Sequence, residues 1–416
     1  MRREKQLDPD NPNQRREDSY RGADPPVRVL LLISAMGGNI PTAGLLDDAL
    51  FETTVLAAKF FDPALPLSPH DLVFNAIGDA DRCGPALAAA ERILGCSPSP
   101  LINPPARVAA TGRLGAARLL AGIAELVVPA IARLPRAALA TPDAATRLAT
   151  EGFAFALLVR APGFQTGRHF LAVDDAAALG RSLNALPGET FFVIRPLDAR
   201  GADGLFRKYR VMLIEGALYP LHLAISPEWK VHYFTAAMAG NASFRAEEAR
   251  FLADMPGVLG SRAMAALGEI GNQLGLDYAG VDFALGPTGE VLLLEANPAM
   301  AIVPPNADPR WNYRREALRR VLDSIRRMLV GRAVQAAAAS AGSRAERSAG
   351  ISLAGRGRLN RKPCTSVQFS AESAANCSSV STPSAVVAMP RLLQSPVTAR
   401  TIAMLSGRQE SSRTND

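Results

Sequence analysis

The chain has 416 residues, 48% of them hydrophobic, and a formal net charge of +7 at pH 7. This length is enough for two or three domains with their own cores, and no apolar run reaches the roughly 18–20 residues that cross a bilayer. Residues 331–416 hold 11 basic and 4 acidic residues, whereas residues 1–330 hold 35 of each sign. Because the part expected to fold is neutral, we expect neither membrane binding nor specific nucleic-acid binding.

The two ends of the chain differ in composition from its middle. Residues 1–26 are polar and proline-rich, and residues 335–416 are rich in Ala, Ser, Arg and Thr without a sustained apolar period. Both compositions predict disorder. No apolar segment follows the N-terminal charges, as a secretory signal would require, and the four cysteines show no CxxC spacing. We therefore expect a reduced, cytoplasmic protein.

Residues 27–107 predict a small α/β domain. Residues 29–33 form a continuous apolar run that a glycine-bearing loop closes, and further strand patterns lie at 71–76 and 101–102. A helical pattern covers about residues 83–94. Strand, helix and strand at this spacing indicate a parallel sheet.

From residue 108 to 334, strand patterns alternate with helical ones. The strand patterns lie at 155–160, 170–173, 191–197, 209–214 and 217–224, and the helical patterns at 245–255, 262–274 and after 311. Together the two regions predict a mixed α/β (α+β) protein with more than one sheet.

The strongest candidate site is a β-hairpin predicted at residues 281–297, with Gly-Pro-Thr-Gly at 286–289 as its turn. If residues 285 and 290 pair, one face is apolar and the other carries Asp282, Glu295 and Asn297. Carboxylate and amide oxygens suit Mg²⁺ (or Mn²⁺) that holds phosphates. Without a metal, two acids this close should repel each other. The alternative is a pair of solvated acids on an open hairpin face.

A second candidate is the loop after residue 160. Arg160 ends a strand, Gly163 and Gly167 lie in the loop, and Arg168 precedes the next strand. Backbone N–H groups of such a loop can fold over phosphates while the two arginines neutralise charge. A plain hairpin loop is the alternative.

A third candidate follows at residues 189–210. The apolar strand there offers the backbone of Val193 and Ile194 to an adenine edge, and Asp198 could bind ribose hydroxyls. Lys208 and Arg210 lie two apart on a strand and therefore point the same way, toward a polyphosphate in this interpretation. A solvated basic face explains the two cations equally well.

One further segment is rich in polar and aromatic side chains. His222, Trp229, Lys230 and His232 fall within eleven residues, and the chain has only four histidines and two tryptophans. A cluster of this kind beside a nucleotide site would be a natural pocket for a second substrate. A structural loop with a packed tryptophan is the alternative.

In this order the motifs resemble the ATP-grasp superfamily, over roughly residues 27–330. The resemblance implies a Rossmann-like pre-ATP-grasp domain at 27–107 and an ATP-grasp domain at 108–334, whose two subdomains clamp ATP. It also implies that Asp282, Glu295 and Asn297 hold the metal. Arg160 stands where most members have a phosphate-binding lysine, and Arg210, with Lys208, matches the cation that acts on the phosphates. The loop has fewer glycines than is usual in the family.

The reaction that this resemblance implies is an ATP- and Mg²⁺-dependent ligation. A small-molecule carboxylate attacks the γ-phosphate of ATP, and an amine or another nucleophile then displaces phosphate from the acyl phosphate. A small-molecule kinase with the same metal residues and a nucleotide-binding module without turnover are the alternatives. The sequence is also compatible with a homodimer.

Overall fold

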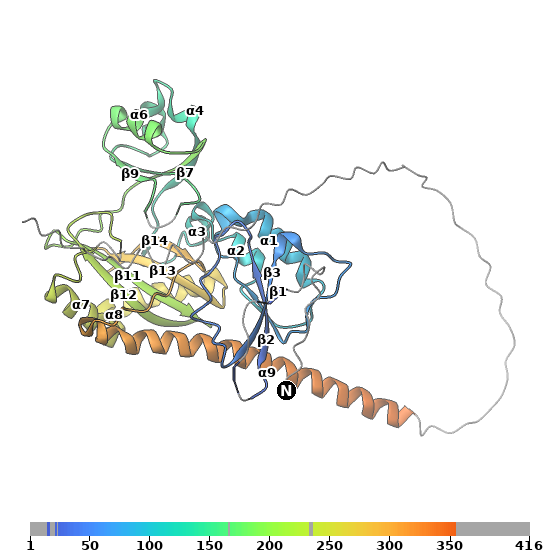
Figure 1. Cartoon of the computed structure of the whole chain (residues 1–416). Helices are drawn as coiled ribbons and strands as arrows, with labels where there is room; N and C mark the ends of the chain where they lie inside the picture. Colours follow the sequence, from blue (N-terminus) through green and yellow to red (C-terminus); the bar gives the residue numbers. More distant parts are fainter. Residues whose placement is uncertain (1–14, 17–20, 23, 165–166, 233–235, 355–416) are drawn as a thin grey trace, which may run out of the picture. The chain divides into compact units, whose positions relative to one another are not determined.

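The computed structural model describes residues 15–16, 21–22, 24–164, 167–232 and 236–354. These residues form three sheets of five, four and five strands, with helices packed around them (Figure 1). The predicted mixed α/β class is thereby confirmed. Among the described helices, none combines the length and the apolar content that a bilayer crossing requires.

The first sheet has the strand order β1-β3-β2-β4-β5, and the last four strands run parallel. Its elements are β1 (Arg15–Arg16), β2 (Val27–Ile33), β3 (Phe51–Ala57), η1 (Ala58–Phe60), β4 (Leu72–Asn75), α1 (Ala80–Leu94), β5 (Leu101–Ile102) and α2 (Pro105–Ala109). Three of its strands and α1 follow the predicted pattern. The sequence missed β3, whose polar Glu and Thr residues interrupt the apolar run, and β1, which lies in a segment predicted to be disordered.

The second sheet is antiparallel, in the order β7-β10-β8-β9. This region contains α3 (Arg113–Leu119), β7 (Ile131–Pro135), α4 (Arg136–Leu139), α5 (Ala144–Thr150), β8 (Leu157–Arg160), β9 (Phe170–Val173), α6 (Ala176–Ala185) and β10 (Thr190–Ile194). Its core includes Leu157, Val159 and Phe191, all fully buried. The loop between β8 and β9 is the loop that the sequence analysis predicted to bind phosphates. Residues 165–166 of this loop lie outside the described part of the chain.

The third sheet has the order β12-β11-β13-β14-β6. Its elements are β6 (Leu126–Val127), β11 (Phe206–Ile214), β12 (Ala217–Ser226), α7 (Ala242–Ala253), α8 (Met255–Leu274), β13 (Tyr278–Leu285), β14 (Val291–Asn297) and η2 (Pro309–Arg314). The helices α7 and α8 contact β12. Apolar residues of β11 and β13 alternate between two cores, because successive strand residues point to opposite faces.

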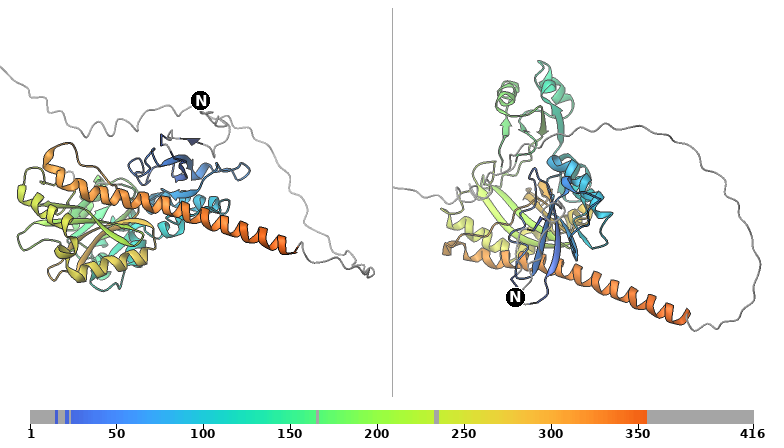
Figure 2. Two further views of the ribbon diagram at one scale, coloured as in Figure 1. Left: turned by 90° about the horizontal axis from the view of Figure 1, so that it is seen from below. Right: turned by 45° about the vertical axis from the view of Figure 1, so that its right-hand side comes forward.

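The helix α9 (Arg315–Ala354) is much longer than predicted. Its first half packs along the third sheet, against β11 and β12 (Figure 2). It also contacts β4 of the first sheet. The prediction of disorder from residue 335 is wrong for residues 335–354, which are helical. The alanine-rich run that suggested low complexity also has the highest helix propensity. Residues 355–416 lie outside the described part of the chain.

A buried asparagine links the first sheet to the third. Asn103 donates a side-chain hydrogen bond to the carbonyl of Tyr278 (2.8 Å) and accepts one from the N–H of the same residue (2.9 Å). The N–H of Asn103 also donates to Asp277 (3.0 Å). The contacts join residues 1–355 into one compact unit, and the predicted domain division at 107/108 stays a prediction.

Candidate functional site

A cavity of about 770 Å³ collects most of the predicted site residues. It is lined by strands of the second and third sheets and by part of the loop after β2. The predicted residues on its walls are Arg160, Gly167, Ile194, Asp198, Lys208, Arg210, His222, Trp229, Lys230, His232, Asp282, Glu295 and Asn297. Residues as far apart in the sequence as Arg160 and Asn297, 137 positions, therefore line the same cavity.

The hairpin β13–β14 carries the predicted metal residues, but its register differs from the prediction. Its turn is one residue longer, because Leu285 pairs with Val291. Beside Asp282 a bulge then places Leu294 as an extra residue in β14. Without the bulge, Leu294 would face Asp282, and Glu295 would point to the other side of the sheet. The bulge turns Glu295 back so that it lies directly opposite Asp282.

Four ionisable side chains form a row across the third sheet. Glu295 lies opposite Asp282, and Asp282 lies opposite Arg210. Arg210 in turn lies opposite His222 on β12. Residues opposite each other in neighbouring strands share a face, and all four line the cavity. We call these four residues the charged row; at about 4.8 Å per strand it is roughly 14 Å long.

The buried Asp282 is clamped by two cations. Arg210 donates from Nε to Oδ1 (2.5 Å) and from Nη2 to Oδ2 (2.7 Å), and Lys208 donates from Nζ to Oδ2 (3.1 Å). Burial alone would raise the pKa of Asp282, but Arg210 and Lys208 outweigh it and hold this pKa well below its ordinary value. The acid is therefore ionised at neutral pH.

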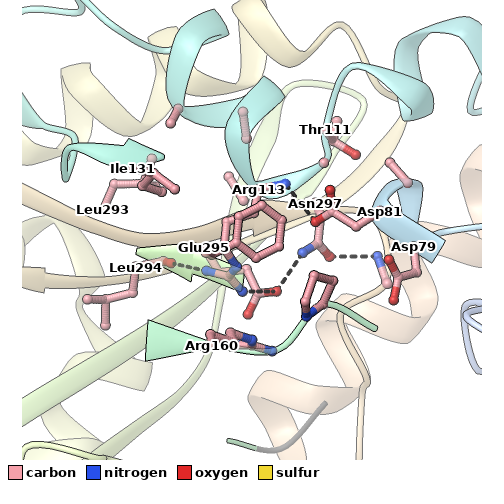
Figure 3. A pocket seen from close by; sticks show the side chains of 18 of the residues that line it. Asp79, Asp81, Thr111, Arg113, Ile131, Arg160, Leu293, Leu294, Glu295 and Asn297 are labelled. Carbon is pink, nitrogen blue, oxygen red and sulfur yellow. Dashed lines mark hydrogen bonds and ion pairs between the residues drawn. The ribbon is translucent and has the colours of Figure 1, made fainter. Parts of the chain in front are cut away.

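Glu295 is held by Arg113 and Asn297 (Figure 3). Both donate to Oε1, from Nη2 of Arg113 (3.3 Å) and from Nδ2 of Asn297 (3.0 Å). The pKa of Glu295 is lowered: burial opposes ionisation, but the charges of Arg113 and Arg160 favour it more strongly. The sequence prediction that the two acids repel each other is thus incomplete, because each has its own cations. Arg113 itself was missed, since no motif surrounds it at the start of α3.

Arg160 ends β8 and lines the large cavity. Its Nη2 donates to the carbonyl of Phe164 (2.6 Å), and its guanidinium lies over the ring of Phe170 at 5.4 Å from the centroid. Burial, and then the charge of Arg113, lower the pKa of Arg160 to about 10. Arg160 stays charged at neutral pH. Burying this charge costs desolvation free energy, which a bound anion would offset.

Not every predicted phosphate or nucleotide residue reaches the large cavity. Gly163 lines a smaller neighbouring space of about 50 Å³, which also touches Arg160, Glu295 and Asn297 (Figure 3). The guanidinium of Arg168 lies over Phe164, 5.7 Å from its centroid, and lines neither space. Roles of these residues toward ATP stay predictions.

At the end of β10, the strand predicted to bind adenine, one residue lies in the core and the next lines the cavity. The side chain of Val193 is fully buried in the core of the second sheet, whereas Ile194 lines the cavity. The N–H of Arg195 donates to the carbonyl of Ala130 (2.9 Å) and is thus engaged within the protein. Asp198 accepts a bond from the N–H of Arg200 (3.3 Å) through Oδ1 and lines the cavity.

The four polar and aromatic residues between 222 and 232 form two groups in the structure. Trp229 packs edge-on against Phe170 at 5.3 Å, and Lys230 donates to the carbonyl of Phe170 (3.0 Å). Burial, and then the charge of Arg160, lower the pKa of Lys230. These two residues therefore contact the start of β9, directly after the loop between β8 and β9.

The two histidines form the other group, near the basic residues of β11. Burial, and then Arg210, lower the pKa of His222 well below its ordinary value. Burial and Lys208 lower the pKa of His232. Both imidazoles are therefore neutral at pH 7, in a region of positive potential.

The donor set suits a hard divalent cation. Asp282, Glu295 and Asn297 carry side-chain oxygens on one face, as Mg²⁺ prefers, although Oδ1 of Asn297 accepts from the N–H of Ala299 (2.9 Å). The described residues contain no group of three or more His, Cys, Asp or Glu side chains that could hold a metal; this trio has two acids and one amide. The cations Arg210 and Lys208 occupy the oxygens of Asp282, so they would have to move for a metal ion to bind there.

Comparisons with family models and with curated proteins gave no match. Among solved structures, the chain is similar to a D-alanine–D-alanine ligase from Bacillus anthracis complexed with ATP (13% identity, 74% of this chain, 97% of that chain, TM-score 0.48). It is also similar to a RimK domain ATP-grasp protein from Sphaerobacter thermophilus, at 17% identity over 74% of this chain and 99% of that chain, with a TM-score of 0.43. The D-cycloserine synthetase DcsG is similar at 16% identity over 73% of this chain and 99% of that chain, with a TM-score of 0.42. These structural neighbours are ATP-grasp proteins.

The ATP-grasp superfamily is the one that the sequence motifs predicted. With identities of 17% or less and TM-scores below 0.5, these likenesses carry no argument about this chain. The reaction of this chain has to be inferred from its own side chains.

Proposed function

We propose that this chain is an ATP- and Mg²⁺-dependent ligase that joins a carboxylate to an amine or another nucleophile. One observation carries the proposal. The buried Asp282 and the partly buried Glu295 face each other across a hairpin at the wall of a large cavity. The cations Arg160, Lys208 and Arg210 line the same cavity. Acids for a hard cation beside cations for phosphates are what a site for Mg-ATP requires.

In this proposal each side chain has a defined part. Arg160 and Lys208 bind the phosphates of ATP, and Mg²⁺, when bound by Asp282 and Glu295, supplies further neutralisation of phosphate charge. Arg210 stabilises the negative charge that moves during transfer. The substrate carboxylate attacks the γ-phosphorus, the bond to ADP breaks, and an acyl phosphate forms. A nucleophile then attacks the acyl carbon and releases phosphate.

The sharpest test is Glu295→Gln, because Glu295 is less tightly held than Asp282. Binding of the non-hydrolysable analogue AMP-PNP is measured by calorimetry with and without Mg²⁺. We expect the parent to bind more tightly with Mg²⁺, and Glu295→Gln to lose most of that gain, since the metal loses a charged oxygen ligand. Glu290→Gln, at the far end of the same hairpin, is the control and should behave like the parent.

Asp282→Asn adds a second arm to the test. It should also abolish the effect of Mg²⁺, but it should lower the stability of the free protein, because Arg210 and Lys208 lose a buried partner. If the parent gains nothing from Mg²⁺, or if both variants keep the gain, the proposed function is wrong. Trapping of an acyl hydroxamate with hydroxylamine would distinguish the ligase from a kinase.

A further inference from the structure

The β12 end of the charged row is a built polar site that combines His222 with Arg314, a residue in none of the sequence motifs. His222 is 5% exposed and Arg314, from η2, is 6% exposed, yet both line the large cavity. At about 4.8 Å per strand, His222 lies two strands, or roughly 10 Å, from Asp282. This end is therefore separate from the predicted metal residues but within reach of a small molecule that reacts beside them.

A buried carboxylate behind the wall fixes the geometry of this end. Glu248, on α7, forms an ion pair with Nε of Arg314 (3.1 Å) and accepts a hydrogen bond from the N–H of Leu223 (3.3 Å), the residue after His222. Its other oxygen accepts from the hydroxyl of Tyr313 (2.6 Å). One fully buried acid thus anchors both η2 and β12, so that Arg314 and His222 are held in place before a ligand arrives.

The charges around this end favour an anion. The charged groups around His222 are the cations Arg210, Lys208 and Arg314 and the acids Asp282 and Glu248. When a metal ion takes Asp282, the cations outnumber the acids still further. The same cavity is also lined by the apolar residues Met300, Val303, Pro305 and Leu318. A cationic end and apolar residues in one cavity fit an anion on a short aliphatic chain.

We propose that the acid substrate carries two anionic groups. One is the carboxylate that reacts at the γ-phosphate, and the other, a carboxylate or a phosphate-type group, binds to Arg314 and His222. A short aliphatic spacer lies along the apolar residues. This inference rests on the proposed function, because that function defines which carboxylate reacts.

The test uses the full chain saturated with Mg²⁺ and AMP-PNP, whose binding is measured first. Glutarate, 3-phosphonopropionate and the monocarboxylate butyrate are then titrated by calorimetry. We expect one of the two dianions to bind at least about ten-fold more tightly than butyrate, the effect of a single charge-assisted contact. Whether glutarate or the phosphonate is preferred identifies the second anionic group. Equal binding of all three acids, or binding of none, overturns the inference.

Variants then locate the second group. Two variants change the site: the single variant His222→Gln, and the double variant Arg314→Gln with Glu248→Gln, in which no buried acid is left without its cation. Each should reduce dianion binding to the level of butyrate, while AMP-PNP still binds. Arg319→Gln, one turn further along on the exposed side of α9, is the control. An unchanged dianion preference in folded site variants, or an equal loss in the control, rejects the site. If the site variants do not fold, the comparison of acids on the parent decides. Failure of AMP-PNP binding in the parent instead rejects the proposed function.

Discussion

At the residue scale, the site depends on how buried charges are paired. Asp282 and Glu295 are acids at a cavity wall, and each is neutralised by cations that a polyphosphate would also attract. Such groups are costly to bury unless they are paired. Pairing within the free protein therefore keeps the acids ionised and the cations in place until a ligand exchanges the partners.

Arg160→Gln tests the phosphate role of one such cation. We expect it to weaken ATP binding by about 1–3 kcal/mol, the scale of a charge-assisted contact, with little effect on adenosine, which lacks phosphates. Fluorescence or calorimetric titration with both ligands measures this. Arg181→Gln, exposed on α6 of the same region, should change neither affinity. An equal loss for ATP and adenosine would show that Arg160 supports the fold instead.

At the element scale, an ion pair joins two strands of the first sheet. Arg28 on β2 donates to Asp71, just before β4, from Nε (3.0 Å) and from its backbone N–H (3.0 Å). Hydrogen bonds from Arg28 lower the pKa of Asp71 against the opposing effect of burial. The folded state thus prefers the ionised acid, which stabilises it above the unfolded pKa of about 4.

Asp71→Asn should therefore destabilise the protein at pH 7 by up to about 1 kcal/mol, since both side chains are more than a third exposed and solvent screens them. The difference should shrink as the pH falls below about 4 and through the folded pKa. Urea unfolding at pH 7 and pH 3 measures it. Glu189→Gln, at a highly exposed acid, should show no effect at either pH. A difference that persists unchanged at pH 3 would assign the effect to packing.

At the scale of the whole molecule, the described contacts of α9 with the core lie in its first half. Met328, Leu329 and Ala333 are buried, and Ala333 is the last buried residue among those the structure describes. Arg332 binds Glu215 (3.0 Å) and Asp277 (2.8 Å). From residue 334 to residue 341, where the description of burial ends, most residues of the helix are exposed.

A chain that ends at Gln335 should keep the melting temperature and the nucleotide affinity of the full chain. A chain that ends at Arg326 should lose several kcal/mol of stability, because it lacks the buried side chains of Met328 and Leu329. Thermal unfolding of the three lengths measures this. A lower melting temperature for the chain that ends at Gln335 would mean that the later residues contribute to the fold.

The sequence by itself determined the local features of this protein. Apolar runs predicted β2, β4 and β5, and the Gly-Pro-Thr-Gly turn predicted the hairpin with Asp282, Glu295 and Asn297 on one face. These features depend on side-chain period and turn chemistry, which short segments contain.

Only the tertiary structure decided how those features combine. The bulge at Leu294, the clamp on Asp282 and the contact of Arg113 with Glu295 join segments far apart in the chain, and the spacing of residues in the sequence does not encode such distances. Helix α9 continues past residue 335 because propensity extends a helix that packing against the core has already started. The charged row exists because strand pairing, rather than sequence order, sets which side chains are neighbours.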